Sequence, residues 1–266
     1  MKPKRVTSSF KLPRLTYRVW KVWMRDFDVF KKTWKVNFFP PLLEPIFYLV
    51  ALGFGLGQFV QKIEGLSYIQ FIAPALVAIS IMYSSFFECT YGSFVRMYYQ
   101  KTFDAIISTP INIEEVIAGE MLWGATRSLV SSSIVLCVVA AFGLITSPLF
   151  LLIPLVAFFC GLMFSAIAMC FTSLAPSIDF FNYPGFLFIT PMFLLSGTFF
   201  PLTQLPPFMQ IFANAVLPLT HTVTLTRALL LGNLETQLLI SLAWIAIVTP
   251  VFFILSINLM KRKLIK

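Results

Sequence analysis

Long apolar stretches separated by short polar segments dominate this sequence. Six of them run for about 20 residues or more with at most one charged side chain each. An α-helix needs about 20 largely apolar residues to cross the hydrocarbon core of a bilayer. The pattern therefore predicts six transmembrane helices in a domain of residues 37–260. We expect the spans at residues 40–60, 68–87, 121–145, 148–174, 180–200 and 238–260.

A different pattern precedes the first span. In residues 12–35, apolar side chains such as Leu15, Val19, Trp23 and Phe27 recur at steps of three and four, and cations occupy the opposite face. This periodicity predicts an amphipathic helix in the membrane interface. Residues 1–36 are therefore interpreted as a basic cytoplasmic tail followed by an interfacial connecting helix, which either anchors the chain or forms a docking surface.

Two connections are too long to be simple turns. In residues 91–120, Pro110 disfavours helix in the residue before it and Asn112 can cap the next helix, so we predict a short helix at 102–108 inside a rigid elbow. In residues 201–237, two amphipathic pieces at 207–216 and 222–231, ended by Pro218 and Gly232, are too short to cross a bilayer. We expect this segment to re-enter the outer leaflet.

Composition agrees with a membrane protein. The chain has 266 residues, of which 58% are apolar and only 12% charged, and its mean hydropathy is +0.86. A soluble domain carries roughly twice that charged fraction. The predicted fold class is an all-α polytopic membrane protein of six transmembrane helices, preceded by the amphipathic interfacial helix and carrying a short coupling helix and re-entrant outer helices.

The basic charge has a clear distribution. Twenty Lys and Arg face eleven Asp and Glu, giving a net charge of +9, and eleven of the cations precede residue 36. A cytoplasmic N-terminus places seventeen of the twenty on one side of the membrane, as the positive-inside rule requires. We therefore predict that both termini, including a basic tail at 261–266, are cytoplasmic. The same distribution argues against nucleic acid as a partner.

Catalytic chemistry is sparse. The four cysteines show no CxxC spacing, His221 is the single histidine, and no phosphate-binding GxxxxGK[ST] motif is present. We therefore predict no bound metal or cofactor and no enzymatic activity in this chain. A secondary transporter and a membrane-embedded lipid-processing enzyme remain alternatives.

Charged residues near the spans need partners, because an unpaired charge in hydrocarbon costs at least about 2.5 to 3.5 kcal/mol. Arg127 and Glu120 are seven residues apart, on one face of the third span, while Glu44 and Glu88 lie near cytoplasmic ends. We hypothesise a cytoplasmic-side charge network in which Arg127 pairs with Glu44, Glu88 or Glu120.

Several short segments together carry a family resemblance. In order along the chain they are FDAIISTPI at 103–111, Gly119-Glu120, Leu174-Ala175-Pro176 with Asp179, ITPMFLLSGTFFP at 189–201, Gln204-Leu205-Pro206 and LPLTHTVTLTR at 217–227. The chain resembles the membrane subunits of type 2 ATP-binding-cassette (ABC) exporters, most closely the permeases that export nodulation lipo-oligosaccharides.

The resemblance implies a permease of the bacterial inner membrane. Two copies would form a path along their interface for an amphiphilic, lipid-linked or glycolipid-like cargo, or a drug, and membrane lipid would surround them. Two separate ABC ATPase subunits would bind ATP and Mg and supply the energy. The implied path runs along the first, second and fifth spans, and its candidate residues are Phe47, Tyr83, Phe188, Met192 and Phe193.

The resemblance also implies which residues couple to the ATPase. Many relatives have a glycine just before the coupling helix, whereas this chain reads Gln100-Lys101-Thr102. The first residue of the helix is therefore left open. The candidate coupling residues are Lys101, Thr102, Phe103, Asp104, Ile107 and Pro110.

Overall fold

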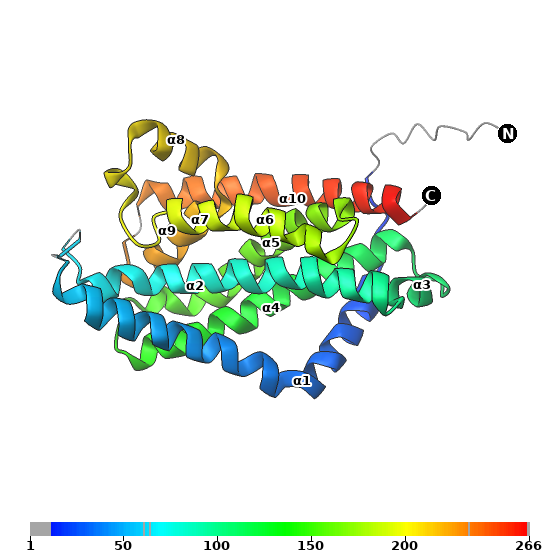
Figure 1. Ribbon diagram of the computed structural model, residues 1–266, viewed down its shortest axis with the longest axis horizontal. Coiled ribbons are helices and arrows are strands. Elements are labelled where there is room, and N and C mark those ends of the chain that lie inside the picture. Colours follow the sequence, from blue (N-terminus) through cyan, green and yellow to red (C-terminus); the bar gives the residue numbers. More distant parts are fainter. Residues whose placement is uncertain (1–11, 61, 64, 234, 265–266) are drawn as a thin grey trace.

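The computed structural model describes residues 12–60, 62–63, 65–233 and 235–264, and it is a bundle of long helices (Figure 1). Within these residues no strand forms beyond an isolated bridge between Ile63 and Leu66. Six helical segments are long and apolar enough to cross a membrane, which confirms the predicted class. They are Val19–Gly53, Tyr68–Tyr99, Ile113–Ala141, Pro148–Leu174, Ile178–Leu195 and Thr236–Leu264. Residues 1–11 and 265–266 of the expected basic tails lie outside the described residues.

The interfacial helix and the first span form one continuous element, with no break in the helix at residue 36. Helix α1 (Val19–Tyr48) runs into a π-helical turn (Leu49–Gly55) and a 3-10 turn (Leu56–Gln58), and it bends along its length (Figure 1). The helix also begins seven residues later than expected. Contacts with the start of the third span hold the preceding residues in a non-helical conformation: the Arg14 backbone N–H donates to Glu114 over 2.5 Å, and the Thr16 hydroxyl donates to Glu115.

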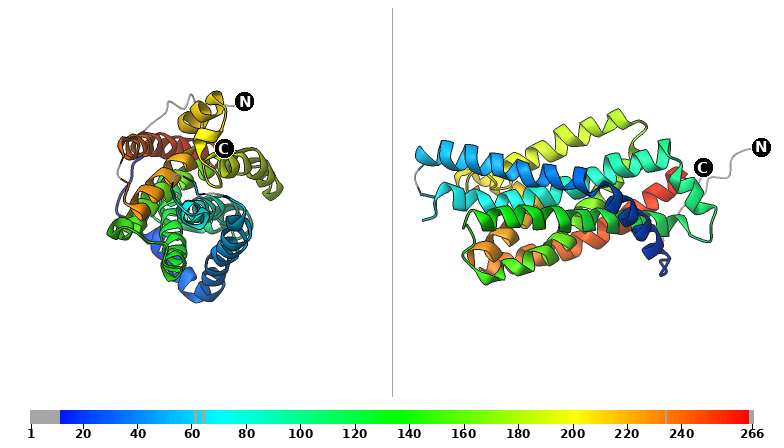
Figure 2. Two further views of the ribbon diagram at one scale, coloured as in Figure 1. Left: turned by 90° about the vertical axis from the view of Figure 1, so that its left-hand side faces the viewer. Right: turned by 90° about the horizontal axis from the view of Figure 1, so that it is seen from below.

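The centre of the bundle contains α2 (Tyr68–Phe87), α4 (Ile113–Ala141) and α5 (Ile153–Leu174), the last preceded by a 3-10 turn (Pro148–Leu152). The end view in Figure 2 shows these helices surrounded by the others. Capping boxes begin two of them, one between Asn112 and Glu115 for α4, as the sequence predicts. Two π-helical turns, Glu88–Gly92 and Val95–Tyr99, extend α2 beyond Phe87.

The fifth span is made of several short pieces. It contains a 3-10 turn (Ile178–Phe181), α6 (Asn182–Pro184), a π-helical turn (Gly185–Ile189) and α7 (Thr190–Leu195). The span ends at Leu195 rather than Phe200, because the chain turns at Gly197, whose φ of 72° favours glycine. Figures 1 and 2 show α1 and the α6–α7 segment on either side of α2.

The last helix, α10 (Thr236–Leu264), is longer than the predicted span. It continues past Met260, so residues 261–264 are helix rather than tail. The Lys263 ammonium donates to the carbonyl oxygens of Thr172, in the last turn of α5, and Ala175, the residue after it, at 2.9 and 2.5 Å. Cations stabilise helix C-termini in this way, which explains the added turn.

Residues 201–237 form a 3-10 turn (Leu202–Gln204), α8 (Pro207–Val216) and α9 (Pro218–Leu231), which lie at the opposite end of the bundle from α3 (Figure 1). Pro218 is the first residue of α9 and not the end of a preceding piece, because proline suits the first helical turn. The buried His221 ring stacks on Trp244 at 4.4 Å between centroids, and its burial lowers the pKa of His221. Gly232 ends α9 as predicted, with a φ of 82°.

Candidate coupling and translocation site

The predicted coupling helix is present at one end of the bundle. Helix α3 comprises Thr102–Ile107, one residue shorter than the expected 102–108, and it begins directly after Lys101. Lys101 has a φ of 55° and is the only non-glycine residue with positive φ among the described residues. A residue other than glycine in this left-handed backbone conformation costs roughly 1–2 kcal/mol relative to the ordinary right-handed helical one. A glycine at this junction would avoid that strain.

The six coupling residues divide into an anchor and an exposed surface. Phe103 is fully buried, so it fixes α3 to the bundle and cannot contact a partner. Thr102 is half-buried. The remaining four, Lys101, Asp104, Ile107 and Pro110, are exposed. The surface that α3 offers therefore combines both signs of charge with an apolar side chain.

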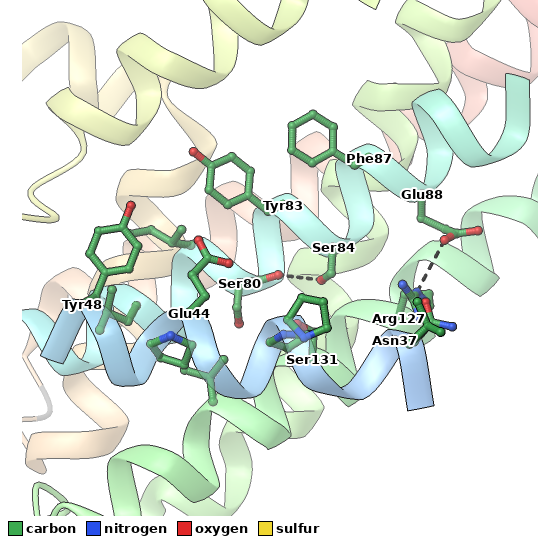
Figure 3. Close-up of a pocket in the computed structure, with 17 residues that line it drawn as sticks. Asn37, Glu44, Tyr48, Ser80, Tyr83, Ser84, Phe87, Glu88, Arg127 and Ser131 are labelled. Carbon is green, nitrogen blue, oxygen red and sulfur yellow. Dashed lines mark hydrogen bonds and ion pairs between the residues drawn. The ribbon is translucent and has the colours of Figure 1, made fainter. Parts of the chain in front are cut away.

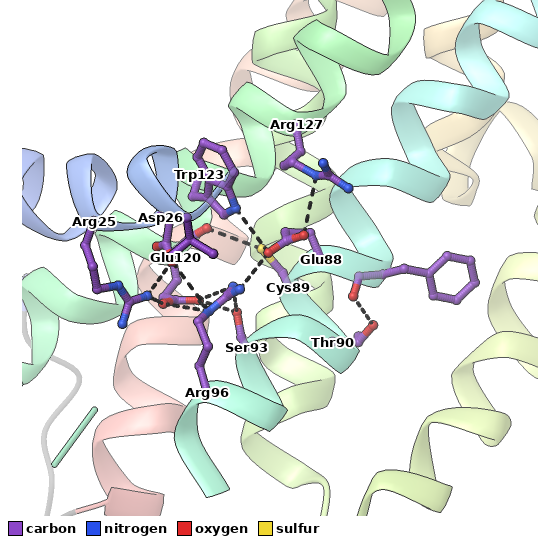
Figure 4. A network of polar contacts seen from close by, with 12 residues as sticks. Arg25, Asp26, Glu88, Cys89, Thr90, Ser93, Arg96, Glu120, Trp123 and Arg127 are labelled. Carbon is purple, nitrogen blue, oxygen red and sulfur yellow. Dashed lines mark hydrogen bonds and ion pairs between the residues drawn. The ribbon is translucent and has the colours of Figure 1, made fainter. Parts of the chain in front are cut away.

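A cluster of buried charges lies beside this elbow (Figure 4). Arg96 is at its centre: Nη1 lies 2.8 Å from Glu88, and Nη2 lies 2.6 Å from Glu120. Glu120 also accepts a 2.7 Å hydrogen bond from Ser93, and Glu88 accepts one of 3.1 Å from the Trp123 indole. The cluster joins the extension of α2 to α4.

Three further residues complete the cluster. Arg25 of α1 contacts its neighbour Asp26 and lies 3.0 Å from Glu120, while Arg127 Nε lies 3.5 Å from Glu88. We define the charge cluster as three arginines and three acidic residues: Arg25, Arg96, Arg127, Asp26, Glu88 and Glu120. Because α1, α2 with its extension, and α4 all contribute, the cluster joins three spans to one another.

The sequence hypothesis named only part of this cluster. Arg127 pairs with Glu88, whereas Glu120 pairs with Arg96 and Arg25 instead. The predicted network contains neither Arg96 nor Arg25. The buried Val19, Val22 and Asp26 recur at steps of three and four. That spacing on a helix was the signal that could have placed Asp26 on the packed face.

Glu44 lies away from the cluster, in a cavity between α1, α2 and α4 (Figure 3). The cavity has a volume of about 350 Å³. Among the described residues, no Lys or Arg lies within ion-pair distance of Glu44. Arg127 and Glu88 line the end of the cavity nearest the charge cluster. The four residues of the hypothesised network therefore occupy two neighbouring sites.

The five candidate path residues do not form one continuous surface. Tyr83 lines the cavity, and its ring lies 6.2 Å from that of Phe193 on α7. Phe188 packs against Phe171 at 5.6 Å, and Met192 is fully buried. Phe47 on α1 is 67% exposed. Burial therefore makes Met192 a core residue, while Tyr83, Phe193 and Phe47 remain accessible to the face between α1 and α7.

Metal ligation has no candidate cluster in the described part of the chain, where no group of three or more His, Cys, Asp or Glu side chains is arranged to hold an ion. The carboxylates of the charge cluster are instead opposed by arginines. The absence of a bound metal or cofactor remains a prediction.

Comparison with known proteins decides the family. Residues 17–231 match the model of the ABC-2 type transporter family, which covers five spans, α3 and the α8–α9 segment. The chain belongs to the ABC-2 type transporter family. Relatives in this family include Nodulation protein J of Rhizobium leguminosarum bv. trifolii, 37% identical over 92% of this chain and 93% of the relative.

Two other ABC-2 relatives show the range of similarity. Nodulation protein J of Sinorhizobium fredii is 34% identical over 92% of this chain and 93% of its own length. The inner membrane transport permease YadH of Escherichia coli is 22% identical over 91% of this chain and 93% of its own length. The alignments with these two relatives therefore extend over nearly the whole of both chains.

Proposed function

We propose that this chain is the transmembrane permease subunit of an ABC exporter, powered by separate ATPase subunits. The observation that carries the proposal is α3, a short helix held at one end of the bundle by the buried Phe103, with Lys101, Asp104 and Ile107 exposed. Family membership supports it, because the chain has no nucleotide-binding motif of its own. Family membership also disfavours the secondary transporter and the lipid-processing enzyme.

The charge cluster gives this proposal a mechanism. In it, ATP binding draws two ATPase subunits together, and each moves the α3 that it contacts. The Arg96 guanidinium joins the extension of α2 to Glu120 of α4, so a displacement of α3 reaches both spans. Arg25 carries the same displacement into α1. The α1–α2 and α6–α7 segments would then separate to open an outward path.

A second copy of the chain completes the proposed path. The face between α1 and α7 carries large exposed apolar side chains, among them Phe47 and, on the fifth span, Phe186 and Leu187, which are 74% and 75% exposed. Two such faces can enclose a route for an amphiphilic, lipid-linked or glycolipid-like cargo. The resemblance to nodulation exporters favours this cargo class, and the YadH name favours the inner membrane. The α3 end, with the basic α10 terminus, would be cytoplasmic.

Co-purification tests the assignment. The chain is co-expressed with an ATPase subunit carrying GxxxxGK[ST], and the stimulation of ATP hydrolysis is measured in lipid nanodiscs. Asp104→Arg reverses an exposed charge on α3 and is expected to weaken ATPase binding roughly tenfold, or about 1.4 kcal/mol. Asp28→Arg, at an exposed site on α1, is the matched control and should bind normally. Equal binding by both variants would exclude α3 as the coupling element.

A further inference from the structure

The cavity between α1, α2 and α4 has mostly apolar walls, and several hydrogen-bonding groups lie among them. Its polar lining includes the Glu44 carboxyl group and the hydroxyl groups of Tyr48, Ser80, Tyr83 and Ser84 (Figure 3). Two of these serines use their own protons within α2: Ser80 donates to the carbonyl of Val77 at 2.9 Å, and Ser84 to that of Ser80 at 2.6 Å. The lone pairs of these two serine oxygens remain free to accept from a ligand, and the tyrosine hydroxyls can both accept and donate.

Three prolines in α1 add further acceptors. Pro40, Pro41 and Pro45 lie inside the helix, and each lacks the N–H that would bond the carbonyl four residues earlier. Those carbonyls belong to Val36, Asn37 and Pro41, and all three residues line the cavity. Backbone carbonyls without helical donors are tolerated at membrane depth only where protein, water or a ligand supplies a donor. A donor-rich ligand in the cavity would satisfy them.

The size and position of the cavity limit the ligand. A volume of about 350 Å³ is near the lower end of small-molecule sites, about 300–1,000 Å³, so it admits a headgroup rather than a whole glycolipid. Tyr83 both lines the cavity and packs against Phe193, so the cavity adjoins the face between α1 and α7. An alkyl chain attached to a bound headgroup could follow that apolar face.

We propose that this cavity binds the sugar headgroup of an amphiphilic cargo, whose hydroxyl groups donate to Glu44, to the freed carbonyls of α1 and to the serine and tyrosine oxygens. This inference rests on the proposed export function and names the chemistry of its cargo. It places the first recognition of the headgroup within one protomer, among the first three spans, rather than between two copies.

A phospholipid headgroup fits these walls less well. A phosphate group would lie against the Glu44 carboxyl group and carbonyl oxygens, which do not donate hydrogen bonds to it. The one cation in the lining, Arg127, already faces Glu88 and lies 5.3 Å from the centre of the Phe30 ring. A choline headgroup offers no N–H or O–H donor at all. A sugar offers several donors without an added negative charge, and tyrosine combines an apolar ring with a hydroxyl that can pair with it.

Photo-crosslinking tests the site on the complete permease–ATPase complex in phosphatidylcholine nanodiscs. The probe is dodecyl maltoside with a diazirine on its sugar, and the crosslinked peptides are identified by mass spectrometry. We expect labelling within residues 36–48, 76–88 and 127–135. Unlabelled dodecyl maltoside should prevent it, and dodecylphosphocholine, which has the same chain, should not. Equal competition by both detergents would show a lipid site and overturn the proposal.

Variants sharpen the test. Glu44→Gln and Tyr83→Phe should each raise the concentration of dodecyl maltoside needed for half-maximal protection about tenfold, as loss of one good hydrogen bond predicts. Ser85→Ala is the matched control beside Ser84, because Ser85 is buried and donates to Ile81 rather than lining the cavity. If Glu44→Gln does not fold, Tyr83→Phe carries the test alone. Unchanged protection in the folded variants would overturn the proposal.

The two proposals can fail separately. The labelling is therefore repeated on the permease alone in the same nanodiscs. If no ATPase subunit associates, but the cavity of the permease alone is labelled and the variants behave as expected, then the export function is wrong and the sugar site stands. If ATP hydrolysis is coupled, and labelling falls on other segments, then the permease assignment stands and the sugar site is wrong.

Discussion

The charge cluster and the cavity lined by Glu44 lie next to each other, and they differ in whether their polar groups are paired within the protein. In the cluster, Arg96 meets Glu88 and Glu120 directly, at 2.8 and 2.6 Å, so charges of both signs are paired within the protein. In the cavity, Glu44 has no ion-pair partner among the described residues, and the prolines of α1 leave carbonyls without helical donors.

This difference separates two uses of buried polarity. A paired network holds helices in fixed register, because separating its members would leave uncompensated charges in a low-dielectric interior. An unpaired set of acceptors stabilises little by itself and is available to a ligand. Substitutions in the cluster should therefore alter stability, while substitutions in the cavity should alter binding.

The strongest test of this contrast is Arg96→Met. Removing the central guanidinium leaves Glu88 and Glu120 buried with less positive charge, which is expected to lower the free energy of unfolding by about 3–5 kcal/mol. The measurement is SDS titration of the purified chain in mixed micelles. Lys31→Met is the control, because its ion pair with Asp28 is exposed and should contribute little. Equal losses in the two variants would mean that the cluster does not hold the helices.

Pro40→Ala should have effects of opposite sign on stability and binding. The new N–H can bond the Val36 carbonyl, so α1 gains up to about 3 kcal/mol of helix stability, while the cavity loses an acceptor and binds dodecyl maltoside less tightly. Pro250→Ala in α10 makes the same chemical change, but the carbonyl that it satisfies belongs to Ala246, outside this cavity. We expect Pro250→Ala to stabilise the protein and to leave its affinity for dodecyl maltoside unchanged. Weaker binding in both variants would contradict the role of the freed carbonyls.

The smallest effect is expected from the double change Ser84→Ala and Ser131→Ala. Both residues line the cavity, and Ser84 bonds only backbone carbonyls of its own helix. The free energy of unfolding should therefore stay within about 0.5 kcal/mol of the starting protein. The same SDS titration measures it. A loss as large as that of Arg96→Met would show that the cavity walls are structural.

The spans and the elbow could be predicted because their signals are local. Length and hydropathy define the six segments, and Pro110 with Asn112 ends one helix and caps the next. The start of α1 could not be predicted in this way. Residues 12–18 carry part of an amphipathic pattern, but contacts with Glu114 and Glu115, about a hundred positions away, override it.

Arg96, the centre of the charge cluster, was not predicted, and the reason is geometric. Two π-helical turns lie in the extension of α2, and each adds residues to a turn, which rotates the following side chains away from the positions that a 3.6-residue period assigns. Arg96 therefore reaches Glu120 across the bundle although helical periodicity does not place it there. The cavity could not be predicted, because the three α1 prolines free carbonyls only where the helix continues through them, and the expected span began at Pro40.

Glu114, at the start of α4, has two partners that are synthesised at different times. Its carboxylate accepts from the Arg14 backbone and from the Lys261 ammonium, both at 2.5 Å, so it joins the segment before α1 to the final helix. Lys261 is made 147 residues after Glu114. At roughly 5–20 residues per second, the ribosome needs about 7 to 30 s to supply it. Until then Glu114 holds only the segment before α1, so its link to α10 forms only after the last span has been synthesised.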